Sequence, residues 1–155
     1  MLTTLADSKR GYDYAVGYIR DIKPRDSNDF ISMSDALAGS NAIDRGAAFA
    51  MVKYRPIAGL STVFMDYYIA DFINTAFAQA EYHFQLPKNL PQWIVGANVI
   101  DQRSVGADLL IGSPFTTFQA SAQVQMTYLG WIGFVAGSVT GNGSQVYSPF
   151  GTQPN

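Results

Sequence analysis

Cysteine is absent from this chain of 155 residues, and histidine occurs only once. The lack of cysteine excludes disulfides, thiol catalysis and cysteine-based metal sites, and a single histidine excludes a multi-histidine metal site. We therefore expect neither a metal nor a cofactor. Long hydrophobic runs are also missing. No stretch of about 18 apolar residues exists, so the sequence predicts no transmembrane helix.

Charged residues are scarce, at 14% of the chain against a usual share of about 25% in soluble domains. The net charge is −2, and the sequence contains neither a basic stripe nor a glycine-rich loop that could cradle phosphate. These features argue against nucleic acid as a partner. Aromatic residues also make up 14% of the chain, including nine Tyr and ten Phe. The composition is unusual for a soluble globular domain.

The segment Thr117–Tyr128 alternates between two kinds of residue. Successive side chains of a strand point to opposite faces, so one face here is apolar and the other is polar but uncharged. The apolar positions are Phe118, Ala120, Ala122, Val124, Met126 and Tyr128, and the polar ones are Thr117, Gln119, Ser121, Gln123, Gln125 and Thr127. A tilted strand needs about 9–11 residues to cross a bilayer. This pattern predicts a wall between lipid and a watery lumen.

The same period of two recurs along the chain and predicts an all-β, antiparallel meander that forms part of a transmembrane β-barrel. We expect about seven strands: Tyr12–Ile22, Arg45–Arg55, Leu60–Ala70, Thr75–Leu86, Gln92–Arg103, Thr117–Leu129 and Trp131–Thr140. Short turns alternate with longer connections, of which the long loops are 23–44 and 104–116. Within Arg45–Arg55, the run Ala47–Val52 would also suit a helix. In the first long loop, Ser32, Asp35 and Gly39 predict one short capped helical turn.

Seven strands cannot close a barrel of the usual even strand number. An open sheet edge in hydrocarbon would leave backbone groups unpaired, at a cost of several kcal/mol for each group. We therefore expect residues 1–155 to form a single, partial β-barrel domain of a larger protein. The N-terminus does not resemble a signal peptide, because its apolar core is too short and its charges follow that core.

Four segments resemble the OprD-type family of outer-membrane porins, in family order. They are Ile22–Ser34, Asp66–Asn74, Asp101–Gly106 and Gly137–Gly143 followed by Ser148–Gly151. The resemblance implies an 18-stranded barrel in the outer membrane of a Gram-negative bacterium. It also implies selective, passive diffusion of small solutes, often carboxylate-bearing, with basic side chains along the lumen and no enzymatic activity. The expected surroundings are the lipid bilayer and lipopolysaccharide, with a possible homo-oligomer.

Six residues are candidates for lining the pore and guiding solutes. Lys53 lies on the parity opposite the apolar set Ala48, Ala50, Val52 and Tyr54, which predicts a lumen lysine. Arg103 is a candidate through the family resemblance, and a salt bridge to Asp101 or Asp108 is the alternative. Arg45 shares the parity of Lys53 but stands at a strand end, where anchoring at the interface is the favoured role. The remaining candidates lie on polar strand faces, and they are Glu81, His83 and Gln123.

Glu81 and His83 are two residues apart on one face and could in principle form an acid–base pair. No nucleophile accompanies them at a recognisable spacing, so a wetted pair in the lumen is favoured. The alternative to a porin is a soluble, lipocalin-like β-barrel that binds a small apolar ligand, with its apolar faces turned inward. The two hypotheses differ in which face of the sheet meets water.

Overall fold

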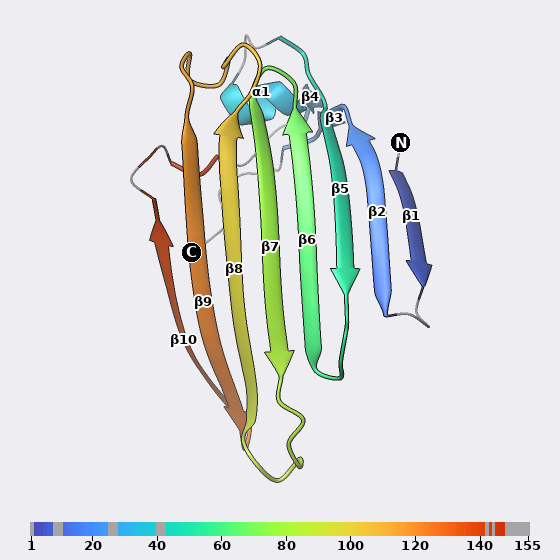
Figure 1. The fold of residues 1–155 in the computed structure, drawn as a ribbon, viewed down its shortest axis with the longest axis vertical. Helices are drawn as coiled ribbons and strands as arrows, with labels where there is room; N and C mark the ends of the chain where they lie inside the picture. Colours follow the sequence, from blue (N-terminus) through green and yellow to red (C-terminus); the bar gives the residue numbers. More distant parts are fainter. Residues whose placement is uncertain are drawn as a thin grey trace.

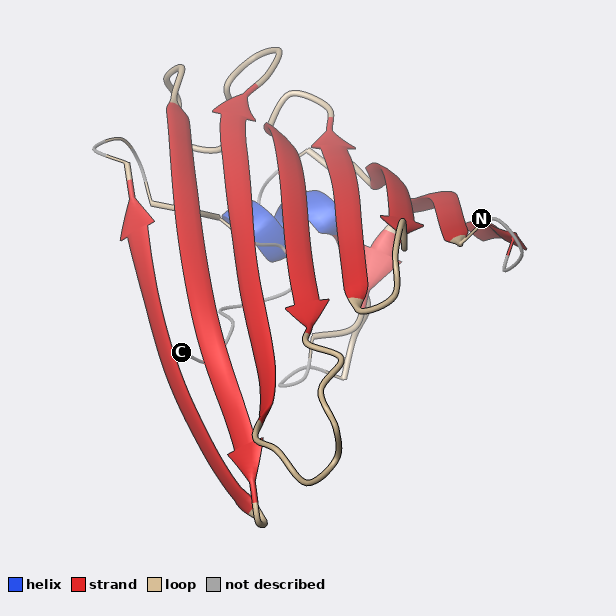
Figure 2. Ribbon diagram, turned by 60° about the horizontal axis from the view of Figure 1, so that its bottom comes forward, coloured by secondary structure: helices blue, strands red, loops and turns tan. Residues whose placement is uncertain are grey.

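The computed structural model describes residues 11–24, 28–39, 43–141, 143 and 145–147, and the backbone of residues 2–7. Within these ranges, eight strands form one sheet in the order β1-β2-β5-β6-β7-β8-β9-β10, and every neighbouring pair is antiparallel. The strands are β1 (Leu2–Asp7), β2 (Tyr12–Ile19), β5 (Ala47–Tyr54), β6 (Leu60–Ile69), β7 (Ile73–His83), β8 (Gln92–Ser104), β9 (Thr116–Tyr128) and β10 (Trp131–Thr140). The sheet is a curved wall with helix α1 (Met33–Ala38) behind its upper end (Figures 1 and 2).

The predicted antiparallel meander is confirmed, with two differences. The additional strand β1 pairs with β2 over Leu2–Asp7. The predicted strand Tyr12–Ile22 is divided, because β2 ends at Ile19 and a short β3 (Asp21–Ile22) pairs instead with β4 (Ile31–Ser32). The carbonyl of Arg20 accepts a hydrogen bond from the amide of Met33, so the chain leaves the large sheet at this residue.

Helix α1 begins and ends as the sequence predicts. The side chain of Ser32 accepts a hydrogen bond from the amide of Asp35 at 3.1 Å, which satisfies one of the free donors of the first turn. Gly39 follows the helix with a φ of 84°, a conformation that glycine adopts without a steric penalty. At six residues, α1 is a single short element, and no helix in the described part of the chain is long and apolar enough to span a membrane.

The face of the sheet that α1 covers is called the concave face here, and the opposite face is the convex face. A hydrophobic cluster fills the space between α1 and the upper concave face. Its buried members are Met33, Ala47, Tyr67, Ile69, Phe72, Ile73 and Phe115. Through this cluster, the loop between β2 and β5 packs against the concave face of the sheet.

Buried Ser34 joins the helix to the end of this loop that leads into β5. Its side chain has no solvent exposure; its hydroxyl donates to the carbonyl of Ile43 and accepts from the amide of Arg45, each at 2.8 Å. It also contacts the hydroxyl of Ser32 at 3.0 Å. A second link runs from the amide of Ser34 to the carbonyl of Arg45 at 3.1 Å.

We expect Ser34→Ala to lower the free energy of unfolding by about 1–3 kcal/mol, because the carbonyl of Ile43 and the amide of Arg45 lose their partner in two part-buried hydrogen bonds. Urea unfolding of the protein in lipid vesicles would measure this change. The matched control is Ser61→Ala on the lower concave face, for which a change within about 0.5 kcal/mol is expected. A similar loss of stability in both variants would contradict a special role for the buried hydroxyl.

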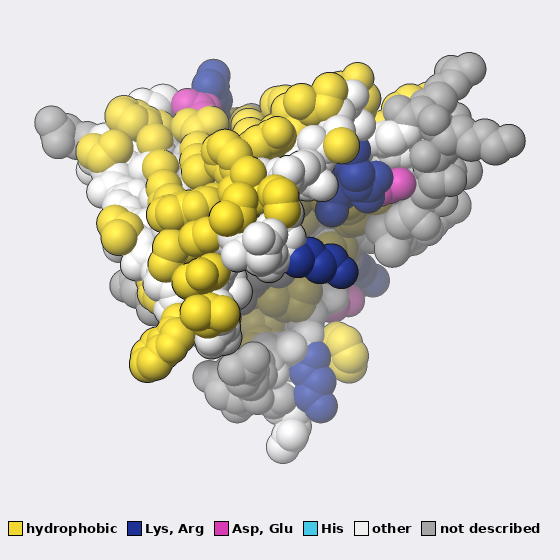
Figure 3. Space-filling view, turned by 90° about the horizontal axis from the view of Figure 1, so that it is seen from below, with side chains coloured by type: hydrophobic (Ala, Val, Ile, Leu, Met, Phe, Trp, Pro, Cys, Tyr) yellow, Lys and Arg dark blue, Asp and Glu magenta, His cyan; other side chains and the backbone are white. Residues whose placement is uncertain are grey.

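The convex face is apolar over most of its height and carries large side chains that are exposed to solvent in this sheet. They include Tyr14, Val16, Tyr18, Val52, Tyr54, Phe64, Tyr68, Trp93, Val95, Val99, Phe118, Val124 and Tyr128. Seen from below, hydrophobic side chains cover the outer side of the curved wall, and the Lys and Arg side chains lie mainly toward its hollow (Figure 3). Scattered exposed apolar residues are normal in soluble proteins, but an apolar face of this extent is typical of a surface that binds another protein or a membrane.

Candidate functional site

A row of side chains crosses the concave face below the part that α1 covers. Lys53 on β5 lies directly opposite Asp13 on β2. Directly opposed residues of antiparallel strands share a face, so the register gives the rest of the row. It continues from Lys53 through Val63, Gln79, Asn98 and Ser121. The hydroxyl of Ser121 donates to Oδ1 of Asn98 at 2.9 Å, and beyond Lys53 the row is uncharged.

The positive charge of Lys53 is not compensated by the nearest carboxylate. Oδ2 of Asp13 is 2.6 Å from Nη2 of Arg55, so this acid is engaged by the arginine at the end of β5. No ion pair joins Lys53 to another residue of the described chain. The group holds two cations and one carboxylate and therefore carries one net positive charge. Lys53 is therefore a cation without an ion-pair partner among the described residues.

Three further candidates share the concave face with Lys53, toward the lower ends of the strands. Oε1 of Glu81 and Nε2 of His83 are 2.6 Å apart on β7, and both side chains are partly exposed. Glu81 is opposite Gly96 on β8, and Gly96 is opposite Gln123 on β9. The recorded polar partner of the His83 ring is Glu81, and no cluster of three metal-ligating side chains occurs in the described residues. These groups can exchange hydrogen bonds with water or a passing solute.

Arg45 lies at the upper rim, away from Lys53. Arg45 precedes β5 by two residues and Lys53 is the seventh residue of that strand. Nη2 of Arg45 is 3.1 Å from Oδ2 of Asp71 in the tight connection between β6 and β7. Together with the backbone hydrogen bonds to Ser34, this pair braces the loop that carries α1. Partly exposed ion pairs of this kind contribute about 0–1 kcal/mol to stability.

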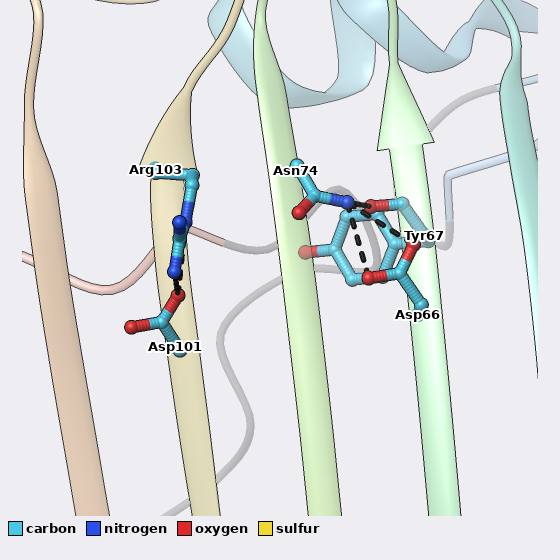
Figure 4. Close-up of polar contacts among 5 residues, drawn as sticks. All are labelled: Asp66, Tyr67, Asn74, Asp101 and Arg103. Carbon is cyan, nitrogen blue, oxygen red and sulfur yellow. Dashed lines mark hydrogen bonds and ion pairs between the residues drawn. The ribbon is translucent and has the colours of Figure 1, made fainter.

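Arg103 lies on the convex face, contrary to the orientation required of a pore-lining residue. It shares the parity of Trp93, Val95 and Val99, whereas Gln102 beside it is buried on the concave side. Nη2 of Arg103 is 2.6 Å from Oδ1 of Asp101, which is one of the two salt bridges expected as its alternative role. Figure 4 shows the two side chains pointing toward each other along β8. The register supplies the reason, because odd-numbered positions on β8 lie on the face opposite the concave row that contains Asn98.

A second polar pair accompanies Arg103 on the convex face. The amide of Asn74 on β7 donates to both carboxylate oxygens of Asp66 on β6 at 3.1 Å (Figure 4). It also contacts the carbonyl of Tyr67 at 3.3 Å. Asn74 lies directly opposite Arg103 in the sheet register. The upper part of the convex face therefore carries a polar patch above the apolar band.

The sequence analysis did not identify Gln102, Thr75 and Tyr67, which form a polar cluster on the upper concave face. Gln102 is only 1% exposed, and its Nε2 donates to Oγ1 of Thr75 at 3.0 Å. Nε2 also lies 3.5 Å from the hydroxyl of Tyr67. In the structure, the strand register aligns the three residues in one row across β6, β7 and β8. The sequence alone indicates only that each lies on a particular face of its strand.

No protein-family model and no curated protein matches this sequence. Solved structures do match the fold. OpdK of Pseudomonas aeruginosa, solved with vanillate, has a TM-score of 0.73 at 15% identity, over 89% of this chain and 35% of its own. OccK2 (OpdF) of Pseudomonas aeruginosa, in complex with glucuronate, has a TM-score of 0.70 at 16% identity, over 88% and 36%. OpdL of Pseudomonas aeruginosa has a TM-score of 0.73 at 17% identity, over 96% and 41%.

The chain has the fold of OprD-type porins. The resemblance noted in the sequence is confirmed at this level, since the matched structures are β-barrel porins with the same antiparallel strand arrangement. The chain spans little more than a third of the length of these porins. Its antiparallel sheet therefore matches a part of the OprD-type fold.

Proposed function

We propose that this chain forms part of the wall of an outer-membrane porin through which small solutes diffuse passively. The observation that carries the proposal is the distribution of side chains on the two faces. Large apolar groups cover the convex face, whereas the lower concave face mixes amides, hydroxyls and a few charges with apolar side chains. A barrel wall with lipid outside and water inside requires this arrangement. The fold similarity to OprD-type porins supports the same conclusion.

In this proposal, the convex face contacts the lipid bilayer of a Gram-negative outer membrane. Its upper polar patch lies toward the lipopolysaccharide headgroups, and association into a homo-oligomer would use part of the same face. Diffusion through a lumen involves no covalent chemistry, so the protein is not an enzyme and uses no cofactor. The single Glu81–His83 pair serves as a wetted part of the lumen wall.

The proposed solutes are small and bear a carboxylate. Lys53 offers one uncompensated positive charge in a wall that is otherwise mostly neutral, and a lumen cation of this kind attracts anions. The adjacent row on the concave face contains Met51, Met65 and Phe77, which suits the apolar body of an organic acid. The vanillate and glucuronate bound to OpdK and OccK2 are carboxylates, which supports this solute class.

The soluble alternative, a lipocalin-like binding barrel, requires the large apolar side chains to lie inside the curve. Phe64, Trp93 and Phe118 instead project from the convex face. In plain buffer this face would expose a continuous apolar surface, which soluble monomers avoid. We therefore expect the protein to require detergent or lipid to stay monodisperse. A monodisperse preparation in plain buffer would favour the lipocalin-like barrel.

We expect Lys53→Gln to lower the anion-over-cation permeability ratio of the reconstituted pore by roughly two-fold at low salt, because one lumen charge is removed. The effect should decrease at high salt, where screening shortens the range of the charge. Reversal potentials across planar bilayers in a salt gradient would measure the ratio. Uptake of a small aromatic carboxylate into proteoliposomes should decrease in parallel.

The matched control is Arg103→Gln, which removes the same charge from the convex face and should leave the ratio unchanged. An unchanged ratio for Lys53→Gln at low salt would remove Lys53 from the solute pathway. Equal changes in the two variants would show that the assignment of faces is wrong. If the barrel that contains this chain forms no channel, the proposed function itself fails.

A further inference from the structure

The segment after β10 turns back into the curve of the wall. The amide of Gly141 donates to the carbonyl of Phe118 at 2.8 Å, which continues the pairing with β9 by one bond. Gly143 then lies against the carbonyl of Thr116, so closely that a Cβ at this position would overlap with it. Residues 145–147, called the strap here, follow on the concave side, and Tyr147 reaches the buried row on β6, β7 and β8.

One side chain, Gln102, makes both short hydrogen bonds of the strap. Oε1 of Gln102 accepts from the amide of Tyr147 at 2.8 Å, and Nε2 donates to the carbonyl of the same residue at 2.7 Å. The side-chain amide thus pairs with one peptide residue as a neighbouring strand would. No backbone–backbone hydrogen bond joins the strap to the described part of the sheet.

The orientation of the Gln102 amide is fixed by its other neighbours. Nε2 has two hydrogens, of which one serves Tyr147 and the other is directed to Oγ1 of Thr75 at 3.0 Å. A reversed amide would place its oxygen against the carbonyl of Tyr147, and two acceptors would face each other. Because Gln102 is 1% exposed, water cannot replace a lost partner cheaply.

The other polar and ring contacts between the strap and the rest of the described chain are a tilted ring pair and one long hydrogen bond. The rings of Phe115 and Tyr147 are tilted at 58°, with centroids 5.5 Å apart. The hydroxyl of Tyr67 is 3.5 Å from the carbonyl of Tyr147, at the limit of a hydrogen bond. The other two strap residues make no recorded hydrogen bond to the described residues, and Gln145 is exposed. The ring of Tyr147 also packs against the hydrophobic cluster under α1. The short hydrogen bonds of the strap are nevertheless both made by the Gln102 amide.

From this geometry we infer that Gln102 is a latch that holds the strap across the upper concave face and thereby sets the opening of the solute pathway there. The effect on the pathway rests on the proposed porin function, whereas the latch itself does not. A segment whose short hydrogen bonds are all made by one side chain opens locally more often when that side chain is lost, without unfolding the sheet. Gln102 acts in this inference as a positioning residue, not as a solute ligand.

The latch can be tested by cysteine accessibility, because the chain contains no native cysteine. In the protein reconstituted in lipid vesicles, Val146→Cys places a reporter on the half-buried part of the strap. Adding Gln102→Met keeps a side chain of similar length but removes both hydrogen bonds to Tyr147. The rate of labelling by a water-soluble maleimide should then rise roughly tenfold.

The matched control is Gln119→Met, which replaces the same residue type on the concave face of β9, where it makes no recorded hydrogen bond to the described residues. This variant should label at the parent rate.

A second pair of variants changes the strap and leaves the sheet unchanged. Tyr147→Pro removes the amide donor of the strap and should also release it, and Tyr147→Ala, which keeps this donor, should label more slowly than Tyr147→Pro. Equal labelling in the Gln102→Met variant and its parent would overturn the latch.

Single-channel recordings test the consequence for the pathway. With the strap released, the open-channel current of Gln102→Met should fluctuate between more levels than that of the parent or of Gln119→Met. Faster labelling with unchanged currents would overturn the link to the pathway. If the Val146→Cys protein with the native Gln102 forms no channel, that result counts against the proposed porin function. The labelling rates would still decide whether Gln102 holds the strap in place.

Discussion

Replacing Phe72 with alanine is expected to lower the free energy of unfolding by about 3–5 kcal/mol, the usual range for a fully buried aromatic side chain. Phe72 is 1% exposed and lies in the tight connection between β6 and β7. It belongs to the cluster that contains Met33 of α1, Ile69 and Ile73. Its removal would leave a cavity under the helix that the rigid strand ends cannot close.

Urea unfolding in lipid vesicles would measure this loss, with Phe30→Ala as the matched control. Phe30 is 72% exposed in the loop that leads to α1, and its replacement should change the stability by no more than about 0.5 kcal/mol. If α1 is seated by this cluster, Phe72→Ala should also make the amides of α1 exchange faster with solvent. A loss below about 1 kcal/mol would contradict the role of the cluster as the core of this part of the fold.

The sequence predicts most of the sheet because the two faces of each strand meet different surroundings. The alternation in Thr117–Tyr128 corresponds to β9 (Thr116–Tyr128) almost residue for residue. In β5, the run Ala47–Val52 is ambiguous alone, and pairing with β2 and β6 makes it a strand. By contrast, β1 has no strict alternation, so its strand conformation depends on its pairing with β2.

Alternation along a strand predicts which face a site residue lies on. It does not predict contacts with a distant loop, so the role of Gln102 was not identified from the sequence. Lys53 lies on the concave face, as its parity indicates, although its contact with solutes stays a prediction. The parity of Arg103 indicates the convex face, but the family resemblance favoured the lumen, and the register follows the parity. Gln102 meets a partner 45 positions along the chain, and no periodic pattern fixes the course of that segment.

The assignment of the faces leads to the second large effect. We expect Ala122→Arg to lower the free energy of unfolding by about 2–4 kcal/mol in a lipid bilayer, the usual penalty for an arginine on the lipid face of a barrel near the midplane. Ala122 lies on the convex face of β9, with Ala97 opposite it on β8 and Gly137 opposite it on β10. None of these small neighbours offers a partner for a guanidinium.

The control is Gln123→Arg, one position along the same strand. Its side chain points to the concave face, beside Gly96, where water can solvate the charge. This variant should therefore change the stability by less than about 1 kcal/mol. Urea unfolding of both variants in vesicles of the same lipid would give the comparison. The alternation of faces requires the penalty to depend on parity, so equal losses at the two adjacent positions would be incompatible with a wall that separates lipid from water.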